Sequence, residues 1–183
     1  MIENLIGKRY AEALSGSISE SSGLGSALEN LRAFTSALDS DTELSPFFAH
    51  PSISGDKKTA MVRDICDKLS VEANVQNLLL TLTERKKILY LRNITEYFEK
   101  VVDNRLNNVR VQVTSASELG PESIERLTSS LGKILGKTVL LTREVDPALL
   151  AGVVLRIGDL VVDATVKNRL ALLKRTIEKE EVA

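Results

Sequence analysis

The residue types that suit a protein core change partway along this chain of 183 residues. All 7 aromatic residues come before residue 101, whereas 13 of the 16 valines come from residue 101 onward. Valine favours β-strands, because its branched side chain is stiff and packs well on a pleated surface. A chain of this length can form one or two domains. The change therefore predicts a helical domain, residues 1–105, followed by a strand-containing domain, residues 106–183.

The first part has the apolar periodicity of a set of amphipathic helices. The clearest stripe consists of Leu24, Ala27, Leu28, Leu31, Phe34 and Leu38. An earlier stripe, in the first helix, consists of Ile6, Tyr10, Ala13, Leu14 and Ser17. About five or six such helices, joined by short connections, predict a helical bundle.

Two serines are predicted to cap the next two helices, because a serine hydroxyl can accept a hydrogen bond from a free N–H group at a helix start. After Ser54, the residues expected to face the core are Met61, Ile65 and Leu69. After Ser70, the expected core residues are Val75, Leu78, Leu79 and Leu82. A last long helix is expected to turn inward Ile88, Leu91, Tyr97, Phe98, Val101 and Val102.

After the join, the apolar spacing changes from helical to alternating. Val109, Val111 and Val113 alternate with polar residues, as in a strand with one buried face. A helix is predicted between Gly120-Pro121 and Gly136, because proline suits the first helical position and glycine the position after the last. Its expected apolar stripe is Ile124, Leu127, Leu131, Ile134 and Leu135.

Three more strands are predicted, at residues 138–143, 152–157 and 160–163. Gly158-Asp159 fits the two-residue turn of a hairpin between the last two. Thr165 is expected to cap a final helix whose inward residues are Val166, Leu170, Leu173 and Ile177. The two parts together predict an α+β protein, with an N-terminal helical bundle followed by a small mixed α/β domain.

No set of residues has the spacing of a catalytic or metal-binding site. The single cysteine, Cys66, excludes an internal disulfide and a cysteine-rich zinc site, and the single histidine, His50, excludes mechanisms that need two. Cys66 is expected to be a small, buried hydrophobic residue. Asp159 and Asp163 are expected to serve in a turn and a cap. We therefore expect no catalytic residue, no cofactor and no metal.

The chain also lacks the signals of nucleotide, nucleic-acid or membrane binding. Residues 132–138, G-K-I-L-G-K-T, have one residue too few for the phosphate-binding loop, and they end a predicted helix where that loop begins one. With 24 basic and 25 acidic residues, the chain has no strong positive field for nucleic acid. No apolar run reaches the roughly 18 residues of a membrane span, and no signal peptide is evident. A soluble protein is expected.

Four segments resemble one family of proteins. Residues 8–14, K-R-Y-A-E-A-L, resemble the R-Y-A-x-A-L start of the delta subunit of bacterial ATP synthase, whose family includes the mitochondrial oligomycin-sensitivity-conferring protein. Residues 47–53 and 77–91 are similar to two further family segments. Residues 146–170 closely follow the signature G-G-x-x-x-x-I-G-D-x-x-x-D-G-S-x-x-x-x-L. The signature residues singled out here are Gly152, Gly158, Asp159, Asp163 and Leu170.

The chain departs from the family pattern at a few positions. Ala151 replaces the first signature glycine, and Ala164-Thr165 replaces the later Gly-Ser pair. Arg85-Lys86 stands where the family has Asn-Gly before the turn from the fifth to the sixth helix. Residues 15–17, Ser-Gly-Ser, follow the opening motif where the family usually has a bulky residue.

The resemblance implies a non-catalytic stator subunit of the F-type rotary ATP synthase, one copy per complex. It implies a six-helix N-terminal bundle on the catalytic head, with the N-terminal helix of an alpha subunit held in a groove between the first and fifth helices. The C-terminal domain is expected to hold the b subunits of the peripheral stalk. Such a subunit would lie at the cytoplasmic face of the bacterial inner membrane without inserting into it.

The groove residues implied by the resemblance are Tyr10, Ala13, Leu14, Asn77, Leu78, Thr81 and Leu82. Ala13 is small enough for a partner backbone to approach, and residues 78–82 hold more leucine than one inward stripe requires. An ordinary broad core is the alternative explanation of these leucines. The alternative function is a nucleic-acid- or ribosome-associated adaptor, against which the near-neutral charge argues.

Overall fold

The computed structural model describes the chain from residue 2 to residue 171, together with residue 173. It divides into two compact units, one ending at Leu106 and one beginning at Asn107. This boundary lies one residue beyond the join predicted from composition. Whether each unit serves a different partner remains a prediction.

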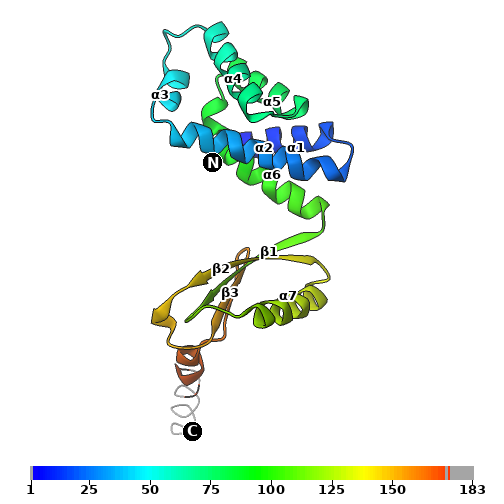
Figure 1. The fold of residues 1–183 in the computed structure, drawn as a ribbon, viewed down its shortest axis with the longest axis vertical. Helices are drawn as coiled ribbons and strands as arrows, with labels where there is room; N and C mark the ends of the chain where they lie inside the picture. The colour runs from blue at the N-terminus through cyan, green and yellow to red at the C-terminus, as the bar shows by residue number, and fades with distance from the viewer. Residues whose placement is uncertain (1, 172, 174–183) are drawn as a thin grey trace. The chain divides into compact units, whose positions relative to one another are not determined.

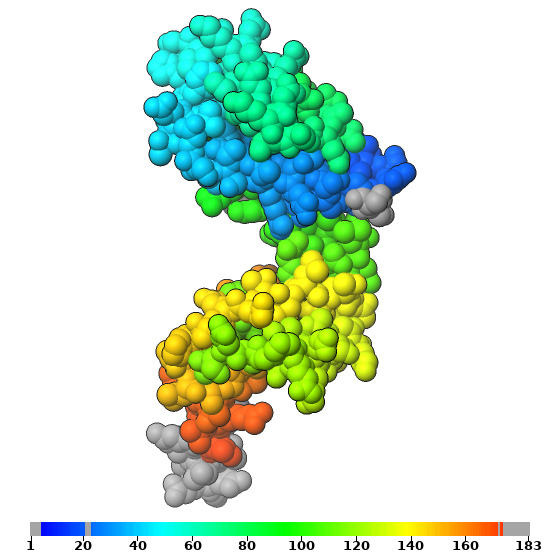
Figure 2. All heavy atoms as spheres, in the orientation of Figure 1, coloured from blue at the N-terminus to red at the C-terminus, as the bar shows by residue number. Residues whose placement is uncertain are grey.

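The first unit is built from helices alone (Figure 1). Helix α1 packs along α6 and also touches α5, while α2 packs against α4, α5 and α6. On the face drawn in Figure 2, the side chains of α1 and α2, in blue, and of α4 and α5, in cyan to turquoise, join in a continuous surface. The elements are α1 (Ile2–Ser17), α2 (Ser21–Ser40), α3 (Leu44–Ala49), α4 (Gly55–Leu69), α5 (Ala73–Glu84), the 3-10 turn η1 (Ile88–Tyr90) and α6 (Leu91–Arg105).

Helix α2 forms the centre of this unit, as its regular stripe predicts. Leu24, Leu31 and Phe34 are almost completely buried, and Phe98 of α6 is buried with them in the same core. Polar contacts tie α2 to α6 at the rim, where Arg32 pairs with Glu99. Burying large apolar side chains is the main favourable term in folding, so the packing of α2 against α6 stabilises this unit.

Helices α1 and α6 cross closely because Gly7 has no side chain. A Cβ atom at Gly7 would lie 2.8 Å from Cδ2 of Tyr97 and 3.0 Å from the carbonyl oxygen of Asn93. At the other end of α1, the Arg105 guanidinium donates a hydrogen bond of 2.8 Å to the carbonyl oxygen of Ser15. α1 is therefore held against α6 both at Gly7 and near its last turn.

Two of the predicted stripes were rotated about their helix axes. The buried hydrophobic residues are Ala11 and Leu14 in α1 and Ile18 directly after it, whereas Ala13 and Ser17 are exposed. In α4 the buried residues are Val62 and Cys66, while the predicted Met61 and Ile65 are half-buried and Leu69 is exposed. Adjacent apolar residues lie about 100° apart on a helix, so a short sequence with apolar residues at several phases does not fix the buried face.

The predicted cap at Ser70 was wrong. Ser70 ends α4 in the left-handed conformation, with φ of 51°, and its N–H donates to the carbonyl oxygens of Cys66 and Asp67. The residue that precedes α5 is Glu72. Ser54 does precede α4, but its side chain makes no capping hydrogen bond.

The second unit is a four-stranded mixed sheet with a helix on one face (Figure 1), which confirms the α+β class. The strand order is β2-β1-β3-β4, with β1 and β2 parallel and the other neighbours antiparallel. Helix α7 makes the crossover between the two parallel strands. The elements are β1 (Asn108–Ser115), α7 (Pro121–Leu135), β2 (Thr138–Val145), the 3-10 turn η2 (Pro147–Leu149), β3 (Val153–Ile157) and β4 (Leu160–Asp163).

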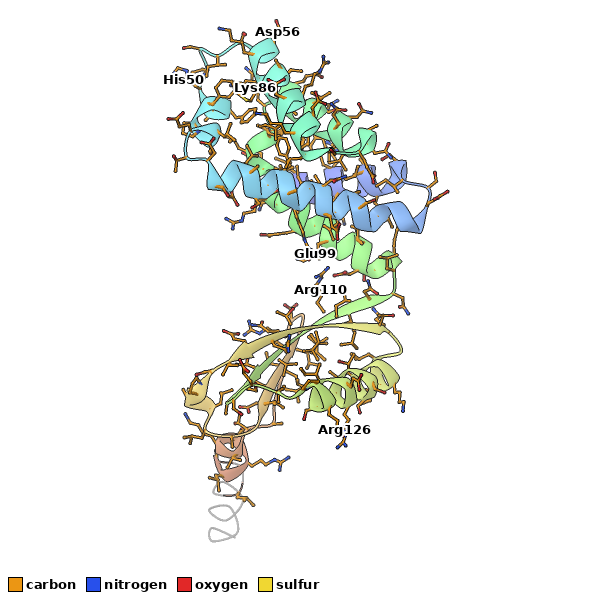
Figure 3. All side chains as sticks on the ribbon, in the orientation of Figure 1. His50, Asp56, Lys86, Glu99, Arg110 and Arg126 are labelled. Carbon is orange, nitrogen blue, oxygen red and sulfur yellow. The ribbon has the colours of Figure 1, made fainter. Side chains whose placement is uncertain are left out.

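The alternation in β1 produces the small core of this unit. Val111 and Val113 are fully buried under α7, together with Leu131 and Val139. Figure 3 shows Arg126 on the side of α7 that points away from the sheet. The predicted Ile134 was wrong as a core residue, since 78% of it is exposed near the helix end.

The hairpin predicted between β3 and β4 is confirmed, with Gly158 at φ of 58° in its turn. Thr165 caps the helix that follows: its hydroxyl accepts a 3.2 Å hydrogen bond from the N–H of Asn168. The inward stripe predicted for that helix was wrong, because Val166, Leu170 and Leu173 are 44%, 60% and 60% exposed. Its fourth member, Ile177, lies outside the described residues. The described part of this helix lies at the edge of the sheet, where it has no core to face.

Gly152 permits the tightest backbone contact of the second unit. Its φ is 98°, and a Cβ atom there would lie 2.6 Å from the carbonyl oxygen of Ala164 and 2.7 Å from Cα of Thr165. Both contacts are with backbone, which cannot rotate away as a side chain can. Gly158 also has positive φ, but a Cβ atom there would meet open space.

Gly152→Ala should destabilise the sheet by at least about 2 kcal/mol, because the added methyl group meets backbone and the backbone angle is unfavourable. Gly158→Ala, the matched control, should cost about 1 kcal/mol from the backbone angle alone. Hydrogen exchange of the β1 and β3 amides in the full chain measures both effects. Equal loss of protection in the two variants would contradict the close contact.

Candidate partner-binding groove

A groove runs along the first unit between α1 and α5. It has a volume of about 510 Å³ and is lined by one face of each helix. The lining residues are Arg9, Tyr10, Ala13, Leu14 and Ser17 from α1, and Asn74, Asn77, Leu78, Thr81 and Arg85 from α5 and its end. On both helices these residues recur three or four positions apart, which is the spacing of one helix face.

The floor of the groove is apolar and its edges are polar. Leu14 and Leu78 are both buried, and they form the boundary between the groove and the core beneath it. Ala13 is exposed, so a small side chain stands where a bulky one would fill the space. The hydroxyl of Thr81 donates to the carbonyl oxygen of Asn77, at 2.8 Å, so it already has a partner within α5. Such a surface suits an apolar helix face better than a polar ligand.

The backbone at the end of α5 positions Arg85. The chain turns sharply there, with Lys86 in the left-handed conformation at φ of 55°. The N–H of Lys87 donates to the carbonyl oxygen of Leu82 at 2.7 Å, which closes the helix end. Lys86 occupies the position where the related pattern has glycine, and the turn forms nonetheless.

A second hollow, of about 410 Å³, adjoins this end of the groove. Arg9, Tyr10 and Arg85 line both hollows, and Leu5, Ile6 and Lys87 complete the second. The start of α1 therefore lies beside the end of α5, so the two walls of the groove run antiparallel. Lys87 also lies over the ring of Tyr90, with 5.3 Å between its Nζ and the ring centroid.

The structure brings together six of the seven groove residues expected from the sequence. Leu82 is not one of them: its side chain is fully buried in the core and lines neither hollow. Four lining residues were not expected from the sequence: Arg9, Ser17, Asn74 and Arg85. Their spacing from Ala13 and Thr81, by four residues or seven, was the available signal. That the groove binds a partner remains a prediction.

The leucine surplus of α5 is divided between the core and the groove. Leu79 and Leu82 are fully buried, Leu80 is half-buried, and Leu78 lies at the border. The broad-core explanation accounts for three of the four. Only Leu78 contributes to the groove surface.

Two signature residues of the second unit, Asp159 and Asp163, lie where the backbone turns. Asp163 accepts a 2.9 Å hydrogen bond from the N–H of Thr165, and its own carbonyl oxygen accepts from the side-chain amide of Asn168. The bond from the backbone N–H of Thr165, followed by one from its side chain, lowers the pKa of Asp163. Asp159 lies in the hairpin turn beside Gly158. These contacts fix the geometry in which β4 passes into the final helix.

An apolar surface is exposed where β4 meets that helix. We call it the β4–helix surface. Each of its residues is at least two fifths exposed. It consists of Leu160, Val162, Val166, Leu170 and Leu173. Val161 is also exposed, but it pairs with Arg156 and lies on the opposite face of the sheet. Exposed apolar residues on neighbouring elements are typical of protein interaction sites.

Within the part of the chain that the structure describes, no cluster of histidine, cysteine or carboxylate residues could hold a metal ion. His50 lies on the outer edge of its unit after α3 (Figure 3), and its Nδ1 accepts a hydrogen bond from the N–H of Ser52. The glycine-rich segment 132–138 leads from α7 into β2, so its context is that of a helix end. Among the described helices, none is both long and apolar enough to cross a membrane.

Comparison with known proteins gives one consistent family. The family model for the ATP synthase delta (OSCP) subunit matches residues 6–177. The ATP synthase subunit delta of Desulfatibacillum aliphaticivorans is 34% identical over 176 residues, 96% of each chain. That of Citrifermentans bemidjiense is 35% identical over 179 residues, 98% of this chain and 99% of the relative. A chain of the Toxoplasma gondii mitochondrial ATP synthase shares the fold, with a TM-score of 0.65 and 20% identity over 93% of this chain and 96% of its own.

Cys66 should react slowly with thiol reagents in the folded protein. It is buried on α4, and burial, followed by the charge of Asp67, raises its pKa to about 11. At pH 8 only about one thiol in a thousand would then be ionised, against roughly a quarter of free cysteine at its usual pKa. Alkylation by iodoacetamide should be at least tenfold slower than in urea-unfolded protein. Equal rates would contradict the buried position.

Proposed function

Because the chain belongs to the ATP synthase delta (OSCP) subunit family, and is thus a non-catalytic stator subunit of the F-type ATP synthase peripheral stalk, we propose that it joins two partners. The first unit would bind the alpha subunit on the catalytic head. The second would bind the b subunits of the stalk. The alternative of a nucleic-acid-associated adaptor has no support among the comparisons.

The groove between α1 and α5 is the observation that carries the first assignment. A groove with an apolar floor and polar edges is the kind of surface to which an amphipathic helix binds. The family resemblance implies that this helix is the N-terminal helix of an alpha subunit. The exposed Ala13 would let its backbone approach closely.

The β4–helix surface supports the second assignment. It gathers exposed apolar residues of the second unit, whereas a hollow on the sheet face opposite α7 is lined by polar residues such as Gln112, Thr142 and Arg156. Helical stalk subunits could cover an apolar strip of this kind with an apolar face of their own. The contact would use side chains of both the strand and the helix after it.

The remaining parts of the proposal concern the whole subunit. We assign helices α1 to α6 to the six-helix bundle of the family, and one copy of the chain to each complex. The subunit would lie at the cytoplasmic face of the bacterial inner membrane, as a peripheral component. Two binding units on one chain raise the effective concentration of each contact once the other has formed. That arrangement would hold the catalytic head against the torque of the rotating shaft.

Ala13→Asp should weaken binding of a synthetic alpha-subunit N-terminal peptide at least tenfold, because a carboxylate in an apolar groove would lose its hydration. The side chain is exposed, so the variant should fold. Ala33→Asp places the same change on an exposed position of α2, outside the groove, and serves as the control. Titration calorimetry gives both affinities. Unchanged affinity in folded Ala13→Asp would refute the groove assignment.

Leu170→Asp should weaken binding to purified b-subunit soluble domains at least tenfold, while peptide binding in the groove stays unchanged. A central apolar anchor commonly contributes about 2 kcal/mol or more. The matched control is Ile134→Asp, since Ile134 is also exposed and apolar but lies on α7, away from the β4–helix surface. If both variants bind b equally well, the stalk contact lies elsewhere.

A further inference from the structure

We infer that the groove selects the direction of its occupant by charge, and that the alpha-subunit helix carries one or more carboxylates on the end that lies between Arg9 and Arg85. The inference rests on the proposed function, because it assumes that a helix occupies the groove. It adds a chemical requirement on that helix and a means of fixing which way it points.

The two ends of the groove differ in charge. Arg9 on α1 and Arg85 at the end of α5 face the same end, and Lys87 lines the adjoining hollow. The opposite end is formed by Ser17 and Asn74, which are uncharged. Because the walls run antiparallel, this asymmetry comes from positions far apart in sequence.

The two arginines are available to a partner. Both are exposed, and neither guanidinium group forms an ion pair or hydrogen bond with another described residue, although the backbone N–H of Arg85 donates to the carbonyl oxygen of Thr81. The carboxylate nearest in sequence to Arg9 is that of Glu12, which lies 3.9 Å from Lys8 and does not line the groove. Glu84 precedes Arg85 on α5 but is not part of the groove lining either. The described residues that line the groove thus include two arginines and no acidic residue.

The residues that line the other end carry no charged side chain. The hydroxyl of Ser17 already donates to the carbonyl oxygen of Leu14, at 2.8 Å. A helix bound in the reverse direction would place its carboxylates against Ser17 and Asn74, and would leave two guanidinium groups partly covered without a counter-charge. Charge complementarity of this kind discriminates between binding modes more than it raises affinity. An arginine can in addition hold a carboxylate by two parallel hydrogen bonds.

The test uses the full chain and the synthetic N-terminal peptide of the alpha subunit of the same organism. The double variant Arg9→Gln/Arg85→Gln should bind the peptide about tenfold more weakly at low salt, and its affinity should depend less on salt than that of the unchanged protein. The control Arg63→Gln/Arg92→Gln removes the same charge from exposed positions on α4 and α6, and should bind as the unchanged protein does.

Charge exchange tests direction. Peptides in which single acidic residues are replaced by lysine should bind more weakly to the unchanged protein. One of them should regain affinity with the Arg9→Glu/Arg85→Glu variant. No recovery with any peptide, or a loss in the double glutamine variant that is equal at all salt concentrations, would overturn the inference, since lost packing of the arginine stems would then explain the effect.

A neutral variant separates this inference from the proposed function. Ala13→Gln enlarges the groove wall without changing charge, with Ala33→Gln as its control. If Ala13→Gln weakens binding while the arginine variants behave as their control does, a helix occupies the groove but charge does not orient it. If neither Ala13→Gln nor the arginine variants alter binding, the groove is not the binding site and the proposed function fails at this surface.

Discussion

The close crossing of α1 and α6 is the contact on which the rest of the first unit depends. Gly7 lets the backbone of one helix approach the side chains and carbonyl groups of the other, and this approach turns Ala11, Leu14 and Ile18 into the core. Because that face of α1 is buried, the face that carries Tyr10, Ala13 and Ser17 remains outside the core, beside α5. The groove is therefore a result of how α1 is seated. A bulkier residue at position 7 would rotate or lift α1 and alter the groove without touching it.

The sequence predicted those elements whose signals are local and redundant. In α2, six apolar residues at one phase leave a single possible buried face, and that face was confirmed. The same holds for the turn at Gly158, the alternation in β1, and the limits of α7, where Gly136 takes the left-handed conformation. Each of these features depends on residues within a few positions of one another.

Predictions failed where the neighbouring element decides the outcome. Helices α1 and α4 carry apolar residues at more than one phase, so the helix packed against them selected the buried face. The residues after Thr165 have the spacing of a core-facing helix, but the described part of that helix has no core to face and leaves Leu170 exposed. Arg9 and Arg85 are distant in sequence, and only the antiparallel arrangement of α1 and α5 brings them to one end. The identity of the partner came from the family resemblance, because composition and spacing describe the surface of a groove and not its occupant.

The contact at Gly152 determines how a load would enter the second unit. The N–H of Ala164 donates to the carbonyl oxygen of Val153, and that of Val166 donates to the carbonyl oxygen of Ala151. These hydrogen bonds join the residues after β4 and the first turn of the final helix to the start of β3. A pull on that helix would strain these hydrogen bonds together, before it reached the turn at Gly158, and the sheet would resist as a stiff unit. A stator subunit must resist torque, so a stiff junction between β3 and the final helix would suit it. Gly152 contributes to that stiffness because it allows the two segments to lie close together.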